Sequence, residues 1–143
     1  VLKALSSLLV NGVRGEDIVC RVGGEELCVV LPNSPGEAAM LVAEKLCNQV
    51  RDLHLDFHGQ SLGKLTLSIG IATYPHDAED YASLMKLADV ALYEAKENGR
   101  DHARHCNTNI QSADTLQVPS ETMLPIPAEP ASSESITLSA QAE

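Results

Sequence analysis

The chain has 143 residues, enough for one domain with a buried core, and its formal net charge is −10. This acidic balance argues against binding of nucleic acid, which needs a cationic surface, and one Phe, three Tyr and no Trp offer no platform for base stacking. No run approaches the roughly 20 apolar residues of a membrane-spanning helix, so we expect no membrane contact by this segment.

The cysteines lack CxxC spacing and mostly stand among apolar neighbours: Cys20, Cys28, Cys47 and Cys106. This pattern favours buried free thiols over a disulfide framework and is typical of a reducing compartment. We therefore expect a cytoplasmic protein. Because the sequence starts at Val, we interpret it as a piece of a longer protein, and a membrane anchor in a preceding region stays open.

The first predicted elements are a helix and a hairpin. Apolar residues at helical spacing predict a helix over 2–11, which Asn11-Gly12 would end. Two apolar runs, at 17–22 and 27–31, flank Gly23-Gly24. Since glycine reaches positive φ without a Cβ clash, these runs predict a β-hairpin closed by the two glycines.

A second helix is predicted after the hairpin. Ser34-Pro35-Gly36-Glu37 has the spacing of a capping box, with proline at the first helical position. The helix would run to about residue 53 and turn an apolar stripe inward: Ala38, Leu41, Val42, Leu46 and Val50.

Strands and a last helix follow. A short stretch at 55–57 and the alternating run at 65–71 predict strands, and Tyr74-Pro75 would end the second one. A helix is predicted over 80–98 with Gly99 at its C-terminal cap, and a short strand is expected near 102–105. The inward side chains of this helix would be Leu84, Leu87, Ala88, Ala91, Leu92 and Ala95.

The composition changes near residue 106. From Asn107 onward Ser, Thr, Pro, Ala and Glu dominate, with too little apolar surface to offset the entropy of ordering the chain. We predict a partial domain over 1–105 and a disordered Ser/Pro/Ala/Glu-rich tail over 106–143. The element order predicts an α/β sandwich, in which helices cover a mostly antiparallel sheet.

The most informative stretch for function is Gly23-Gly24-Glu25-Glu26-Leu27. Glycines at a turn let backbone N–H groups approach an anion, but two adjacent carboxylates would repel phosphate. A Mg²⁺ ion between them would turn that repulsion into coordination, because Mg²⁺ takes a few carboxylate oxygens together with substrate phosphates. The stretch predicts a nucleotide-phosphate and metal site; the alternative is an ordinary hairpin with exposed glutamates.

Three motifs in order resemble the GGDEF domain, the diguanylate cyclase family. They are the turn 23–27, the strand 65–72 and the closing helix 88–100. The resemblance implies an adenylyl-cyclase-like (ferredoxin-like) fold and the condensation of two GTP into cyclic di-GMP and pyrophosphate. It also implies Mg²⁺ (or Mn²⁺) as cofactor and a homodimer, because each of two facing domains holds one GTP.

The resemblance assigns roles to the turn and to the closing helix. Glu25 matches the metal ligand that helps to deprotonate the attacking hydroxyl, with Glu26 beside it, and Gly23 and Gly24 would let the backbone pass under the phosphates. Lys96 and Arg100 lie four residues apart on one helix face and match positions that grip GTP phosphates. The two cations would also complement the helix C-terminus, and both interpretations hold together.

Arg14-Gly15-Glu16-Asp17 fits the family's RxxD motif, where cyclic di-GMP binds and inhibits the enzyme. Arg offers a planar fork to guanine and phosphate, and Asp accepts from guanine N–H groups. RxxD alone is a common chance pattern, and its register with the glycine turn supports the product site. A partner position that is often Arg is Lys45 here.

The N-terminal part departs from the family. The family's first strand ends in an aspartate that is a second metal ligand, and an Asn and an Asp after it hold the guanine. Only 13 residues precede Arg14 and none is Asp, so the first strand and helix are missing and a sheet edge would be uncovered. We expect this fragment alone to be inactive. A degenerate domain that binds cyclic di-GMP or serves in dimerisation is the alternative.

Two further sets of side chains imitate zinc ligands. His54 and His58 form one set, and His102, His105 and Cys106 form the other. Neither set supplies the four closely held ligands of a structural zinc site, so we do not expect metal there.

Overall fold

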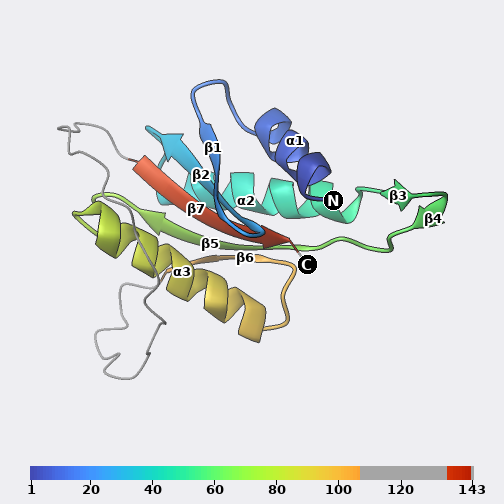
Figure 1. Cartoon of the computed structure of the whole chain (residues 1–143). Helices are drawn as coiled ribbons and strands as arrows, with labels where there is room; N and C mark the ends of the chain where they lie inside the picture. The colour runs from blue at the N-terminus through green and yellow to red at the C-terminus, as the bar shows by residue number, and fades with distance from the viewer. Residues whose placement is uncertain (107–134, 143) are drawn as a thin grey trace.

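The computed structural model describes residues 1–106 and 135–142 (Figure 1). Five strands form one sheet in the order β1-β2-β7-β5-β6, and β3 and β4 form a separate two-stranded ribbon. All neighbours in the large sheet are antiparallel except β5 and β6, which run parallel. The sheet strands are β1 (Ile18–Gly23), β2 (Glu26–Pro32), β5 (Leu67–Thr73), β6 (Ala103–His105) and β7 (Ser135–Ala142).

Helices cover both faces of this sheet. The first two, α1 (Leu2–Gly12) and α2 (Gly36–Arg51), pack together against one face, and α3 (Tyr81–Glu97) covers the other (Figure 1). The small ribbon of β3 (Asp56–Phe57) and β4 (Gln60–Ser61) extends from the end of α2. In the part of the chain that the structure describes, no helix is both long and apolar enough to span a bilayer.

The sequence of β5 explains why the strand is buried on both faces. Leu67, Ile69 and Ile71 are fully buried in the larger core, which α1 and α2 complete. The residues between them are small, and at Gly70 a Cβ would lie only 2.0 Å from the Ala88 carbonyl oxygen of α3. Glycine therefore lets α3 rest directly on the strand backbone.

The predicted hairpin, strands and closing helix are confirmed to within a few residues. The capping box is wrong, because Pro35 is itself the N-cap and the Ser34 hydroxyl donates to the Pro32 carbonyl instead of capping α2. The predicted stripe of α2 is partly wrong as well. Leu46 and Val50 are buried as predicted, but Leu41 is 68% exposed, and Ala39, Ala43 and Cys47 complete the buried face.

The predicted disordered tail and uncovered sheet edge are corrected by β7. Residues 135–142 form a strand that pairs over seven residues with β2 and over seven with β5, both antiparallel. Cys106, also assigned to the tail, is buried beside α3. Residues 107–134 and 143, the rest of the predicted tail, lie outside the described residues.

Three of the four cysteines are buried free thiols, as predicted, and Cys20 is exposed. Burial raises the pKa of Cys28 and of Cys106 to about 12, and that of Cys47 to about 11. These thiols are therefore protonated at neutral pH, and Cys28 and Cys47 act as small apolar side chains in the core.

Candidate functional site: the glycine turn

The glycine turn joins β1 to β2 through a two-residue loop. Gly23 pairs with Glu26, so that only Gly24 and Glu25 form the loop. Gly24 has a φ of +46°, which disfavours any residue with a Cβ. The register shifts between Arg21 and Gly23, and this irregularity bends the strand as it enters the turn.

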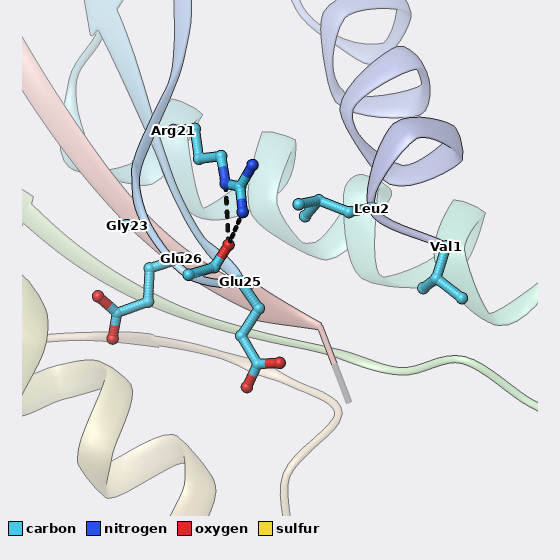
Figure 2. A pocket seen from close by; sticks show the side chains of 7 residues that line it. Val1, Leu2, Arg21, Gly23, Glu25 and Glu26 are labelled. Atoms are coloured by element: carbon cyan, nitrogen blue, oxygen red, sulfur yellow. Dashed lines mark hydrogen bonds between the residues drawn. The ribbon is translucent and has the colours of Figure 1, made fainter.

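Arg21 holds the turn in shape, and the sequence interpretation missed it. Its Nε and Nη2 donate to the Gly24 carbonyl oxygen at 2.8 and 2.5 Å (Figure 2). This forked hydrogen bond ties the loop back to β1. An arginine three residues before the second glycine was the signal that could have indicated this role.

The turn lines an open cleft of about 770 Å³. Its walls come from the turn, from Arg21 and from the start of α1: Val1, Leu2, Arg21, Gly23, Gly24, Glu25 and Glu26. Glu25 and Glu26 are exposed, and their carboxylates point away from one another (Figure 2). This divergence follows from the alternation of side chains where β2 begins.

The donors at the turn suit a hard divalent cation but form only part of its coordination shell. Mg²⁺ takes one or two carboxylates, keeps several waters and accepts substrate phosphates, so one exposed carboxylate beside an open cleft fits it. Among the described residues, the only three side chains with mutually close metal-ligand atoms lie elsewhere, at Asp77, His105 and Cys106. The turn would therefore need further oxygen ligands from the nucleotide.

Lys96 and Arg100 are placed at the same end of the sheet as the turn. The chain runs through α3 opposite to β5, so the last turn of α3 returns to the end where β5 begins, near the tip of the β1–β2 hairpin (Figure 1). Lys96 lies in that last turn and is half-buried, whereas Arg100 follows the helix and is exposed. Arg100 has a φ of +60°, in a tight loop after Gly99.

The RxxD residues form a separate loop at the far end of β1. The Arg14 N–H donates to Asp17 Oδ2 at 2.7 Å, and the Asp17 N–H donates to the Arg14 carbonyl at 3.1 Å. The six-residue strand β1 separates this loop from the glycine turn by about 20 Å. The structure therefore does not bring Arg14 and Asp17 together with Glu25 and Glu26.

Lys45, the predicted partner of the RxxD residues, makes a different contact. Its Nζ donates to the Gly12 carbonyl at 3.1 Å, which fastens α2 to the end of α1. Asp17 Oδ1 is buried without a hydrogen-bond partner, so one acceptor of this loop is left unused. A ligand that donates hydrogen bonds would satisfy it.

A family model described as "Diguanylate cyclase, GGDEF domain" matches residues 1–102. The chain belongs to the GGDEF-domain family. It shares the adenylyl-cyclase-like fold of solved GGDEF domains, which confirms the predicted fold class. The GGDEF domain of PA1120 (YfiN or TpbB) from Pseudomonas aeruginosa matches with a TM-score of 0.70 and 30% identity, over 74% of this chain and 66% of that one.

Two further relatives carry activity in their names. Diguanylate cyclase A of Treponema denticola is 35% identical over 113 residues, 79% of this chain and 30% of that protein. A structure described as the active GGEEF domain of a diguanylate cyclase from Vibrio cholerae matches with a TM-score of 0.58 and 26% identity, over 74% of this chain and 66% of that one. This GGDEF chain thus spans less than a third of the curated relative's length.

Proposed function

We propose that this GGDEF chain is the C-terminal part of a cytoplasmic diguanylate cyclase domain, which condenses two GTP into cyclic di-GMP and pyrophosphate. The observation that carries the proposal is the arrangement at one end of the sheet. An Arg21-braced glycine turn presents Glu25 beside an open cleft, and the cationic end of α3 lies at the same end. Carboxylates with a divalent cation and lysine or arginine are the groups that phosphoryl chemistry uses.

Each residue has a proposed role in this reaction. Glu25 would hold Mg²⁺ (or Mn²⁺), which when bound neutralises charge on the α-phosphate and lowers the pKa of the attacking 3′-hydroxyl. Lys96 and Arg100 would bind phosphate oxygens, and the glycines would leave room for the nucleotide beside the backbone. Glu26 points away from Glu25 in Figure 2, so it is the weaker candidate for the same ion.

The domain would work as a homodimer, and this chain alone would not be active. Residues that the family uses for the second metal ligand and for guanine have no counterpart before Arg14. The slot between β2 and β5 is filled by β7 from the other end of the chain. We therefore expect activity only when a preceding segment supplies the absent strand.

A fusion tests this function. The part of the Treponema denticola cyclase that precedes the matched region is joined to residues 1–106, and the fusion is incubated with GTP and Mg²⁺. We expect cyclic di-GMP by chromatography, no product from residues 1–143, and loss of product in Glu25→Ala. Glu37→Ala, an exposed glutamate at the start of α2, is the matched control. Equal synthesis by the Glu25→Ala and Glu37→Ala fusions would refute the assigned role.

Binding of cyclic di-GMP at the RxxD loop is the second candidate function, either as product inhibition or as the sole role of a degenerate domain. The observation that favours it is the unused, buried Asp17 Oδ1 in a loop remote from the turn. Calorimetry of residues 1–143 with cyclic di-GMP should show binding that Arg14→Ala abolishes. Binding that survives Arg14→Ala would place the ligand elsewhere.

A further inference from the structure

Three side chains of different metal-binding chemistry converge at the end of the sheet that is remote from the glycine turn. Asp77 lies in the loop after β5, His105 is the last residue of β6, and Cys106 follows it. One ligand atom from each lies within 4.8 Å of the others. In the ranges 1–106 and 135–142 this is the only such group of three.

The backbone fixes all three positions. His105 pairs with Ile71 in the parallel ladder, and the Cys106 N–H donates to the Ile71 carbonyl at 2.8 Å. The Asp77 N–H donates to the Thr73 carbonyl at 2.7 Å, and Asp77 Oδ2 accepts from the Thr73 N–H at 2.7 Å. The cluster is thus part of the ladder between β5 and β6 and needs no rearrangement of the loop to form.

The ring of His105 is oriented as in a metal ligand. Its Nδ1 lies 2.8 Å from the Cys106 carbonyl oxygen, which only accepts, so Nδ1 carries a proton. In the neutral ring Nε2 then accepts from the Thr73 hydroxyl at 3.0 Å, and it lies 3.3 Å from Asp77 Oδ2. A cation between Nε2 and Asp77 Oδ2 would take the place of the Thr73 hydroxyl on Nε2. A carbonyl oxygen on the other ring nitrogen is the usual support of a metal-bound histidine.

Burial and access also suit an ion. The Asp77 side chain is 1% exposed and Cys106 is 5% exposed, whereas the His105 side chain is 31% exposed and leaves an entry path. Gly36 bounds the cluster at the start of α2. A Cβ there would lie 3.2 Å from His105 Nε2 and 3.1 Å from Thr73 Oγ1, so the glycine keeps this side uncrowded.

We propose that Asp77, His105 and Cys106 form a Zn²⁺ site. A carboxylate, an imidazole and a thiolate make the mixed set that zinc accepts, whereas Mg²⁺ and Ca²⁺ select oxygen alone. The negative charges of Asp77 and of the Cys106 thiolate would neutralise the ion, and zinc binding would release the thiol proton to solvent. Water, or His76 whose Nδ1 lies 3.1 Å from Asp77 Oδ1, would fill the fourth position.

The sequence interpretation grouped His105 and Cys106 with His102 and expected no zinc there, because the set lacks the four closely held ligands of a structural site. The structure separates His102 from them by bonding its Nδ1 to the Arg100 carbonyl at 2.7 Å. Asp77 takes the third place instead, from a position almost thirty residues earlier in the chain. No local spacing motif could reveal this set.

The test uses residues 1–143 after treatment with a chelator. We expect one Zn²⁺ per chain after dialysis, and Co²⁺ in its place should give visible bands of a low-symmetry site with a near-ultraviolet thiolate-to-cobalt band. Cys106→Ser should remove the thiolate band. Asp77→Asn and His105→Gln should weaken zinc binding on the order of tenfold or more. Zn²⁺ should raise the unfolding temperature of the unaltered chain but not of these variants.

Controls separate this site from the other thiols and imidazoles. Cys20→Ser and His102→Gln should bind Zn²⁺ and Co²⁺ like the unaltered chain. The proposal is overturned if the unaltered chain binds no stoichiometric zinc, or if the cobalt–thiolate band survives in Cys106→Ser. Where Cys106→Ser does not fold, His105→Gln decides through its zinc affinity, since the His105 side chain is partly exposed and belongs to neither hydrophobic cluster of the core.

Discussion

The two ends of the central sheet carry polar groups in opposite circumstances. At the glycine turn, Glu25 and Glu26 are exposed, point apart and line an open cleft. At the other end, the Asp77 side chain is almost fully buried and makes hydrogen bonds with neighbouring groups. Burial alone would raise its pKa, yet hydrogen bonds with His76 and the Thr73 N–H keep that pKa below its usual value.

The two ends would therefore obtain the ligands of a metal ion from different sources. An exposed carboxylate on a two-residue loop is free of the desolvation cost of burial and depends on the nucleotide to complete an ion's shell. A buried mixed cluster is held in place by the fold and can bind an ion without substrate. One sheet thus separates a proposed substrate-dependent metal site from a proposed structural one.

The packing of α3 on β5, which runs between the two ends, should be most sensitive to substitution at Gly70. Gly70→Val should cost more than about 4 kcal/mol of unfolding free energy or prevent folding, because the new Cβ would lie 2.4 Å from the Leu92 nitrogen and closer still to Ala88. Urea unfolding followed by circular dichroism measures this. Gly15→Val, where a Cβ meets nothing within 4 Å, is the control, and equal midpoints for the two variants would disprove the close packing of α3.

The role of β7 is tested by proline. Ser139 pairs with Cys28 of β2 and with Gly70 of β5, so Ser139→Pro removes a backbone donor from the middle of the sheet. We expect a loss of about 3 kcal/mol in unfolding free energy. Ser139→Ala keeps the N–H and serves as the comparison. If both variants unfold at the same urea concentration, β7 does not hold the two halves of the sheet together in solution.

A smaller effect is expected at the start of α3. Asp80 is the N-cap and accepts from the Ser83 N–H at 2.8 Å, and hydrogen bonding to Ser83 lowers its pKa. A lowered folded-state pKa means that the cap stabilises above the unfolded pKa of about 3.9 and that this stability is lost as pH falls through the folded value. Asp80→Ala should therefore be less stable than the unaltered chain at pH 7, and the gap should close in acid. A gap that stays constant down to pH 2 would contradict the cap.

Much of the fold follows from local signals in the sequence. The alternation in β5, the double glycine of the hairpin and the capped apolar pattern of α3 each act within a few residues, and each was predicted near its observed place. The buried face of α2 was predicted only in part, because Leu46 and Val50 are buried but the apolar Leu41 is exposed.

The features that the sequence did not predict depend on contacts between residues that are far apart in the chain. Ile136, Leu138 and Ala140 alternate with polar residues, a period-2 signal for β7 that the Pro-rich surroundings obscured. Its position between β2 and β5 is set by strand pairing that no local pattern encodes. Asp77 meets Cys106 for the same reason. At the glycine turn, the residue types indicated the chemistry, but Arg21 and the divergence of the two glutamates required the structure.

The most direct test of the central claim is GTP binding by the fusion described above, measured by calorimetry with and without Mg²⁺. If Glu25 holds the ion that carries the nucleotide, Mg²⁺ should tighten GTP binding to the unaltered fusion by about tenfold or more, and Glu25→Gln should lose most of that gain while folding normally. An equal Mg²⁺-dependent gain in the unaltered fusion and in Glu25→Gln would contradict the account.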